Sequence, residues 1–539
     1  MNISSSIRRL AQLFLVLFIA LSGGLVYWQV VVAQQVSTNP HNNRRCLFEN
    51  APVRGTIYDR KGVKLAWSSA DKDARCGYVR HYAEPSLAGL IGYYVYGYQS
   101  TGLEAQYDNI LTGRDGLTSL DNLVNQTLHR PPVGNDIYLT IDVRVQKVID
   151  KDFDLYNRVD NNNSFQSNRG SVVVSNPHTG EILGMLSRPY FDPNKMVQTL
   201  TQGDLSYYNQ LVADKDKPLL ERPIQEVYTP GSTYKTLTLM AGLDSGNTQL
   251  SQQFDQKQAL GPVFYDGHPI GPVGNNLGFG QYTFRFPVTT EYGYENSDNV
   301  IFAQIGVKTG LDKWLEYNKR LYVGQKIPFD LPVATSQVTN PSGDALATVD
   351  LAANAFGQGF VRVTPLQMSL IDNTVANNGQ LMRPMVVSKF TDANKATLQT
   401  FSAQPLGGPV ISTQAATDVR QAMEAVMRCG GGFPIVDSRN SPWGIVGKTG
   451  TGQVDSNGIT PAQAWLITQA PYTQANSGQL PALTIVAMKE NAGEGAYAVG
   501  PMIAHMYDDI FSPGYVQVQR PTVPDPFTFC PSHNLWQTR

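Results

Sequence analysis

One short stretch, residues 228–237, constrains the fold of this chain more than any other part of it. Pro230 and Gly231 are typical of a helix start, and the apolar residues that follow predict a helix that is largely buried. Ser232 then lies in the first turn, and Lys235 lies three positions later on the same face of the helix. The unpaired amides of a first turn favour charge that develops beside Ser232. This serine can therefore act as a nucleophile, provided that the lysine is neutral and takes its proton.

The S-x-x-K pattern is weak by itself, because Ser69 and Lys72 repeat it in a polar stretch that has no helix-start signal. A second motif makes the pattern more specific. A Ser-Asp-Asn triplet at residues 297–299 lies 65 residues after Ser232, at the cap of a predicted helix or in the loop before it.

The third motif, Lys-Thr-Gly-Thr-Gly at residues 448–452, begins 151 residues after the serine of the second motif and lies on a predicted strand. Alternation along the strand places Thr449 and Thr451 on one face and Lys448 on the other. The glycines permit another backbone to approach closely, as an extended peptide would when it joins a sheet edge. Two hydroxyls beside a lysine suit a terminal carboxylate. An isolated Lys-Thr-Gly at residues 308–310 instead ends a predicted helix, where its glycine is a C-cap.

Residues 10–33 form an almost wholly apolar stretch of 24 residues, which predicts a transmembrane helix. Such a helix would be roughly 36 Å long at about 1.5 Å per residue, enough for a hydrocarbon core of roughly 30 Å. Arg8 and Arg9 precede it, so the positive-inside bias places residues 1–9 in the cytoplasm and the remaining chain outside. A cleaved signal peptide is the alternative, although the apolar region of a signal peptide is usually shorter.

The composition excludes several classes of protein. The formal net charge is −2, only 16% of the residues are charged and no basic block occurs, so nucleic acid is not an expected partner. The seven histidines are scattered without metal-ligand spacing, so neither a metal site nor a cofactor is expected.

Four cysteines occur, at Cys46, Cys76, Cys429 and Cys530. Outside the cytoplasm such cysteines can form disulfides. Because the first two fall in one predicted domain and the last two in another, we expect the pairs 46–76 and 429–530. Unpaired buried cysteines are the alternative.

Patterns along the chain predict an α+β fold. After the transmembrane helix come an extended, mostly β pedestal or dimerisation domain at residues 44–160 and a larger domain at residues 169–515. A predicted hairpin over residues 54–66 belongs to the first domain, and the polar run 160–168 marks the boundary. The larger domain begins with another hairpin and ends with three strand-like runs and a helix, which predicts an antiparallel sheet sandwiched by helices. These elements are expected at residues 170–186, 443–454, 464–469, 483–489 and 499–511, before a tail at 516–539.

The order, local structure and spacing of the three motifs resemble those of the penicillin-binding protein and serine β-lactamase superfamily. Residues 54–66 resemble the signature of class B penicillin-binding proteins, and residues 94–116 are similar to the penicillin-binding protein A-like members. Two departures from the family pattern, Glu221 before Arg222 and Leu466 after Trp465, do not touch the reacting groups. Further resemblance to the transpeptidase domain lies at residues 139–146, 173–194, 357–367 and 464–465.

The resemblance implies a membrane-attached peptidoglycan D,D-transpeptidase that cross-links stem peptides outside the cytoplasm, through a serine acyl-enzyme that penicillin also forms. It also implies partnership with a SEDS-type glycosyltransferase in cell elongation or division. The implied roles are Ser232 as nucleophile, Lys235 as base, Ser297 as proton relay, Asn299 as support for Lys235 and substrate, Lys448, Thr449, Gly450 and Thr451 as the groups that bind the substrate carboxylate, and the amides of Ser232 and Thr451 as oxyanion hole.

Other functions use the same three motifs. A D,D-carboxypeptidase would pass the acyl group to water, and a β-lactamase would hydrolyse its acyl-enzyme rapidly. Glu316 lies in the interval where some β-lactamases carry a hydrolytic glutamate, but in a helix-like context. A non-catalytic β-lactam-binding scaffold is the alternative from a different class of protein. A bifunctional protein is disfavoured, because the chain between anchor and larger domain is too short for a glycosyltransferase domain.

Overall fold

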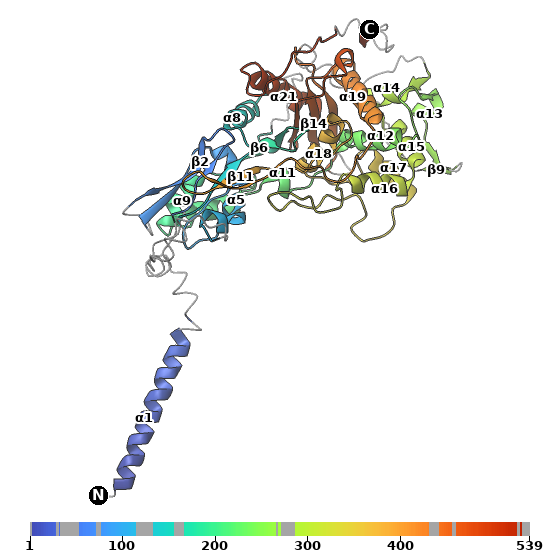
Figure 1. Cartoon of the computed structure of the whole chain (residues 1–539). Helices are drawn as coiled ribbons and strands as arrows, with labels where there is room; N and C mark the ends of the chain where they lie inside the picture. The colour runs from blue at the N-terminus through green and yellow to red at the C-terminus, as the bar shows by residue number, and fades with distance from the viewer. Residues whose placement is uncertain are drawn as a thin grey trace.

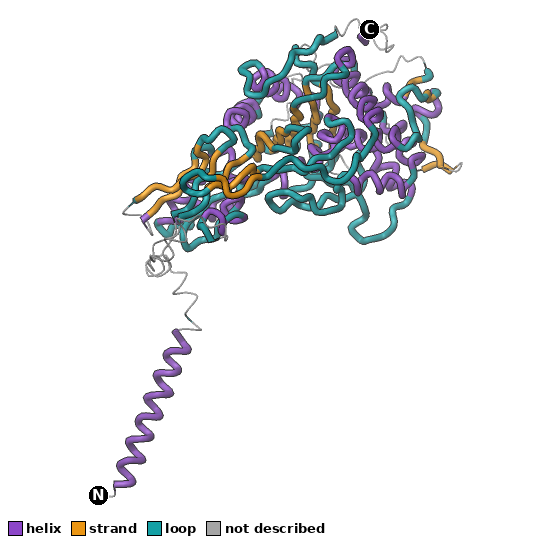
Figure 2. Tube along the Cα trace, viewed as in Figure 1, coloured by secondary structure: helices purple, strands orange, loops and turns teal. Residues whose placement is uncertain are grey.

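The computed structural model describes residues 3–28, 32, 53–71, 77–114, 133–155, 167–265, 268–270, 286–430, 441–454, 460–524 and 529–530. Helix α1 (Ile3–Val26) stands apart from an elongated body that contains the other described elements (Figure 1 and Figure 2). None of the helices in these ranges combines the length and the apolar character that crossing a membrane requires. Residues 29–31 and 33 of the stretch predicted as a transmembrane helix, 10–33, lie outside the described residues. The described helix begins earlier, at Ile3.

A six-stranded sheet forms one end of the body (Figure 1). The β1–β2 part of it matches the hairpin predicted over residues 54–66, with Ile57 opposite Ala66. β11 and β12 come from the segment assigned to the larger domain, and β11 pairs antiparallel with β4. In the order β12-β11-β4-β1-β2-β3, the strands are Thr397–Thr400, Val387–Thr391, Asp136–Leu139, Ile57–Tyr58, Lys64–Ala70 and Tyr78–Tyr82.

Short helices and buried ion pairs support this sheet. Arg54 and Arg80 both pair with the buried carboxylate of Glu104, at 2.5 and 2.7 Å. Because a buried charge persists only when it is paired, we infer that Arg54, the first residue of the hairpin motif, stabilises this part of the fold. Within the described residues this part of the chain mixes strands and helices, so the mostly β expectation is too simple: part of its sheet is supplied from residues 387–400. The helices that precede β4 are η3 (Pro85–Leu87), α4 (Ala88–Ile91), α5 (Gly102–Gln106) and α6 (Asp108–Leu111), whereas α8 (Val143–Asp152) follows β4 and packs against the larger domain.

A five-stranded antiparallel sheet forms the centre of the larger domain. Its order is β13-β14-β15-β5-β6, so strands from both ends of the domain lie together, as predicted. Neighbouring residues of β14 face opposite layers: Thr468 bonds Tyr507 of α21 (Gly495–Phe511), and Gln469 bonds Asp372 of α18 (Pro365–Ala376). The predicted sandwich of helices around a sheet is therefore confirmed. The strands are β5 (Gly170–Ser175), β6 (Ile182–Arg188), β13 (Val446–Gly452), β14 (Gln463–Ala470) and β15 (Leu483–Lys489).

A helical lobe completes the larger domain around α12 (Lys235–Asp244), which is buried along most of its length, as the apolar run predicts. The other elements of the domain are α9 (Pro193–Thr201), α10 (Ser206–Ala213), α11 (Arg222–Gln225), η4 (Gly231–Tyr234), β7 (Gln253–Phe254), α13 (Gln256–Leu260), β8 (Val263–Tyr265), β9 (His268–Ile270), β10 (Val288–Thr289), α14 (Thr290–Glu295), α15 (Asn299–Thr309), α16 (Leu311–Arg320), α17 (Thr348–Ala355), α19 (Thr413–Arg428) and η6 (Gln474–Asn476).

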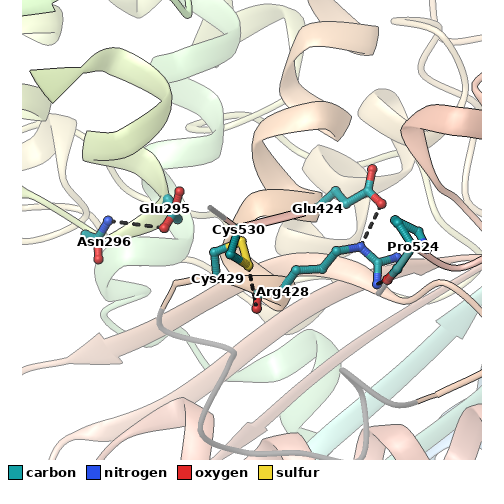
Figure 3. The surroundings of a disulfide bond; sticks show 7 residues. All are labelled: Glu295, Asn296, Glu424, Arg428, Cys429, Pro524 and Cys530. Atoms are coloured by element: carbon teal, nitrogen blue, oxygen red, sulfur yellow. Dashed lines mark hydrogen bonds and ion pairs between the residues drawn. A yellow bond between two sulfur atoms is a disulfide. The ribbon is translucent and has the colours of Figure 1, made fainter. Parts of the chain in front are cut away.

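A disulfide joins Cys429, directly after α19, to Cys530 in the C-terminal tail (Figure 3). This is one of the two predicted pairs, and it is confirmed. Cys46 and Cys76, the members of the other predicted pair, lie outside the described residues. Figure 3 shows Glu295, at the end of α14, on one side of the bond. The disulfide therefore fixes the tail beside the helix that leads into the Ser-Asp-Asn triplet.

Candidate active site

The three motifs meet in one place although they are far apart in sequence. Ser232 lies in the 3-10 turn η4, and Lys235 is the first residue of α12. Lys235 Nζ lies 2.7 Å from Ser232 Oγ and 2.7 Å from Oδ1 of Asn299, the first residue of α15. Lys448 Nζ on β13 lies 3.1 Å from Ser297 Oγ.

The neighbours of Lys235 Nζ determine where its hydrogens point. The carbonyl oxygen of Ser297 at 2.8 Å and Asn299 Oδ1 can only accept hydrogen bonds. A neutral amine has two hydrogens, so donation to these two oxygens leaves its lone pair for the next close neighbour, Ser232 Oγ. In this arrangement the serine hydroxyl donates to the amine. The site can thus take a proton from Ser232 without a histidine.

Both lysines of the site are fully buried, and burial favours their neutral forms. Burial lowers the pKa of Lys235 well below its ordinary value, and the nearby charge of Lys448 lowers it further, whereas Asp298 acts in the opposite direction. Burial also lowers the pKa of Lys448, to about 7. The surroundings therefore favour an uncharged Lys235, which is the form that can act as a base.

Ser297 has an uncommon backbone conformation for a residue with a side chain, with a φ of 61°. This conformation brings both its carbonyl oxygen and its hydroxyl to Lys235 Nζ, at 2.8 and 3.2 Å. Asp298 then caps α15 by accepting from the amides of Val300 and Ile301. The triplet lies at a helix cap, as predicted, and Ser297 Oγ lies between the two lysines.

The strand of the third motif shows the predicted alternation. Lys448 and Gly450 are buried, whereas Thr449 is half-buried and Thr451 is exposed. Lys448 Nζ donates to Ser297 Oγ and to the carbonyl oxygen of Thr449, the latter at 3.1 Å. The two threonines therefore lie on the more accessible face of the strand, while the lysine side chain contacts Ser297.

The two glycines of the motif, Gly450 and Gly452, permit a close backbone approach, but not by the backbone that was expected. A Cβ on Gly450 would lie 2.7 Å from the carbonyl oxygen of Pro230, and one on Gly452 would lie 2.0 Å from that of Thr229. Close backbone approach is thus observed, but the approaching backbone is the segment of this chain that precedes Ser232. These glycines position the nucleophile turn against β13.

The segments that carry the two predicted oxyanion-hole amides, those of Ser232 and Thr451, adjoin each other. Gly231 has a φ of 56°, and a Cβ there would lie 2.3 Å from the carbonyl oxygen of Thr451. The Gly231 amide also donates to the carbonyl oxygen of Gly357, at 3.0 Å. The turn that bears Ser232 is therefore held between β13 and the loop at residue 357.

Two side chains that contact segments of the site had no role predicted from the sequence. Gln358 Nε2 donates to the carbonyl oxygen of Thr451 at 3.3 Å, and Trp465 Nε1 donates to that of Thr229 at 3.0 Å. Both stand in stretches that family resemblance singles out. No spacing rule connects them to the nucleophile, because their contacts cross between segments that only the tertiary structure brings together.

The chance repeats of the motifs lie elsewhere. Ser69 is on β2, where its Oγ lies 2.7 Å from His81 Nε2. Gly310 follows α15 as a C-cap with a φ of 83°, as predicted. Glu316, on α16, pairs at the surface with Lys313 and Arg320. None of these residues contacts the site among the described residues.

Comparison with known proteins agrees with this geometry. Residues 170–504 match the penicillin binding protein transpeptidase domain, and residues 54–137 match the penicillin binding protein A dimerisation domain. The peptidoglycan D,D-transpeptidase PbpA of Mycolicibacterium smegmatis is 30% identical over 512 residues, which cover 93% of this chain and 96% of the relative. PbpA of Mycobacterium tuberculosis is 28% identical over 513 residues, with the same coverage of 93% and 96%.

Solved structures show the same fold. The ceftriaxone acyl-enzyme of penicillin-binding protein A from M. tuberculosis aligns with a TM-score of 0.71 at 26% identity, over 86% of this chain and 99% of that chain. The penicillin G acyl-enzyme of the same protein aligns with a TM-score of 0.70 at 26% identity, over 85% and 99%.

Proposed function

This chain belongs to the penicillin-binding protein transpeptidase family, and from that premise we propose that it cross-links peptidoglycan as a class B, serine-type D,D-transpeptidase. Its substrates are stem peptides that end in D-Ala-D-Ala, and β-lactams acylate the same serine. The observation that carries the proposal is the position of Lys235 Nζ, 2.7 Å from Ser232 Oγ and close to two oxygens that can only accept hydrogen bonds, the Ser297 carbonyl and Asn299 Oδ1.

In the first half of the reaction, Ser232 Oγ attacks the carbonyl carbon of the penultimate D-alanine while its proton passes to Lys235 Nζ. Ser297 Oγ lies between Lys235 and Lys448 and relays a proton to the leaving nitrogen. The bond from the carbonyl carbon to that nitrogen breaks, and D-alanine leaves. In the second half, an amine of a neighbouring stem attacks the ester, forms the new amide and restores the hydroxyl of Ser232.

The remaining residues bind charge that the substrate carries or develops. Thr449, Gly450 and Thr451 on β13, together with Lys448, hold the terminal carboxylate of the donor stem. The amides of Ser232 and Thr451 stabilise the oxyanion, and loss of one such donor typically costs about 2.7–4 kcal/mol. Asn299 holds Lys235 in place through its amide oxygen.

The alternatives receive less support. A β-lactamase needs a group that activates water against the acyl-enzyme, and the ion-paired surface position of Glu316 does not suit that task. A D,D-carboxypeptidase would differ only in using water as the acceptor. Product analysis with a donor stem and an amine acceptor distinguishes the two, because only a transpeptidase yields the cross-linked dimer.

We also propose that the enzyme is attached to the cell membrane with its catalytic domain outside the cytoplasm. The Cys429–Cys530 disulfide supports this location, because disulfides persist mainly in oxidising compartments. The domain boundaries proposed, 44–160 and 169–515, enclose the two matched regions. A SEDS-type glycosyltransferase is the proposed partner, and affinity capture from detergent extracts should recover it.

Labelling with a fluorescent penicillin tests the catalytic assignment. The wild-type protein should become covalently labelled, and Ser232→Ala should abolish the label. Ser69→Ala is the matched control, since Ser69 belongs to the chance S-x-x-K repeat on β2, and it should label like the wild type. A label that persists on the Ser232→Ala protein contradicts the assignment.

A further inference from the structure

A pocket of about 480 Å³ lies between the two interleaved parts of the chain, and the proposed reaction does not use it. Its walls come from the turn between β1 and β2, the end of β4, the turn before β6 and strand β11. None of its lining residues belongs to the three catalytic motifs. The volume is within the range of about 300–1,000 Å³ that small-molecule sites usually have.

The lining of this pocket is strongly cationic. Arg60, Lys61 and Lys389 contribute three positive charges, and Glu181 contributes the single carboxylate. Arg60 meets Glu181 only at 3.5 Å, and Lys389 Nζ lies 4.4 Å from the centre of the Tyr138 ring. No ion pair engages Lys61 or Lys389 within the described part of the chain. Two ammonium groups therefore remain for a ligand.

Two hydroxyls and a backbone amide around the pocket are already engaged. Ser388 Oγ donates to the carbonyl oxygen of Tyr138 at 2.9 Å, and Thr140 Oγ1 donates to that of Ile182 at 2.6 Å. In the turn, the amide of Lys61 donates to Asp59 Oδ1 at 2.8 Å. With three cationic side chains and one carboxylate in the lining, the pocket favours an anion over a neutral sugar or peptide.

We propose that this pocket, the β4–β11 pocket, binds an oxyanion group, a carboxylate or a phosphate, carried by the cell-wall polymer or its precursor. In this proposal the turn of the hairpin motif at residues 60–62, which takes no part in the acylation chemistry, binds a ligand. Only the identity of the ligand's source depends on the proposed function. The charge and shape of the site do not depend on it.

Calorimetric titration of the full-length protein in detergent tests this proposal. Ser232 is first acylated with penicillin G, so that the catalytic cleft is blocked. Two probes distinguish the sources: inorganic pyrophosphate, and soluble muropeptides that carry carboxylates and no phosphate. We expect at least one probe to bind, and to bind more weakly as ionic strength rises, because the cationic groups are partly exposed to solvent.

The double variant Lys61→Ala/Lys389→Ala should bind that probe about tenfold more weakly, the loss expected when one or two charge-assisted contacts are removed. Lys64→Ala is the matched control, because Lys64 is an exposed lysine at the start of β2 that does not line the pocket. It should bind like the wild type. All variants should keep the wild-type melting temperature and penicillin labelling.

Loss of pyrophosphate binding in the double variant identifies a phosphate-bearing source, and loss of muropeptide binding identifies a carboxylate-bearing one. Either result supports the pocket. Failure of both probes to bind the wild type, or equal binding by the double variant, overturns it. If penicillin does not acylate the protein, the proposed function fails, and the same titration on unacylated protein still tests the pocket.

Discussion

At the scale of single residues, the active site places two lysine side chains on either side of one serine hydroxyl. Lys235 Nζ and Lys448 Nζ lie 3.2 and 3.1 Å from Ser297 Oγ. Two ammonium ions so close together in a buried site repel each other, so the charge of Lys448 lowers the pKa of Lys235 below what burial alone gives. The charge of Lys448 thereby helps to keep Lys235 in its basic form.

This arrangement predicts the pH dependence of acylation. Lowering the pH protonates Lys235 and removes the base, so the rate of penicillin acylation should fall by about tenfold per pH unit below the pKa of Lys235. In Lys448→Gln the neighbouring charge is gone, the pKa of Lys235 rises, and the fall should begin at higher pH. Stopped-flow acylation across a pH series measures this. Lys489→Gln, which removes a buried lysine that contacts Phe153, should leave the profile unmoved.

Glu221 is a second residue whose protonation state can be tested. Its Oε1 is buried without a hydrogen-bond partner among the described atoms, and burial raises its pKa from 4.5 to about 8. The folded state therefore keeps a proton that the unfolded state releases between these two values, so this group lowers stability as the pH rises.

We expect Glu221→Gln to become more stable than the wild type as the pH rises from 5 to 8.5, by on the order of 4 kcal/mol in the free energy of unfolding. Unfolding in denaturant at the two pH values measures the difference. A gap that stays constant with pH would show that the carboxyl is already ionised in the folded protein.

At the scale of elements, the turn that carries Ser232 depends on a glycine in another loop. Gly357 has a φ of 84°, and a Cβ there would lie 1.8 Å from the carbonyl oxygen of Gly231. A side chain at this position must displace the turn that carries Ser232. Gly324 has a similar φ of 77° but nothing within 4 Å of the Cβ position.

Gly357→Ala should therefore slow penicillin acylation by on the order of 100-fold, because a displacement of about 1 Å at a reacting group has that effect. Gly324→Ala carries a similar backbone strain without the clash. It should lose about 1 kcal/mol of stability and acylate at the wild-type rate. Equal acylation rates for the two variants would mean that the Gly357 loop does not position Ser232.

At the scale of the whole molecule, a disulfide closes a long loop of the chain. The Cys429–Cys530 disulfide spans 101 residues and ties the tail to the end of α19. Arg428 beside it pairs with Glu424 at 2.7 Å (Figure 3). A cross-link over so long a loop restricts the unfolded chain more than the folded one.

Cys429→Ser/Cys530→Ser should lower the free energy of unfolding by about 2–4 kcal/mol. Thermal unfolding with and without a reductant measures this loss: reductant should lower the melting temperature of the wild type. Any effect of reductant that persists in the double variant would report on Cys46 and Cys76. A wild type that is insensitive to reductant contradicts a stabilising role for this bond.

The sequence by itself predicted the opening hairpin, the three terminal strands and the helix around Leu237 in the larger domain, and it named the residues that the fold brings together at the site. Hydrophobic periodicity and helix-start signals suffice for α12 and for the cap at Asp298, because these depend on neighbours within a turn or two. The order of Ser232, Ser297 and Lys448 marked the family, since that combination is specific even though each motif is not.

Only the tertiary structure decided what depends on contacts between distant segments. The pairing of β11 with β4 joins two parts of the chain that a polar boundary separates in sequence. The left-handed backbone of Ser297, the glycine contacts of β13 and the hydrogen bonds from Gln358 and Trp465 follow from packing, which no local pattern encodes. The low pKa of Lys235 arises for the same reason, because burial and the neighbouring Lys448 exist only once the chain has folded.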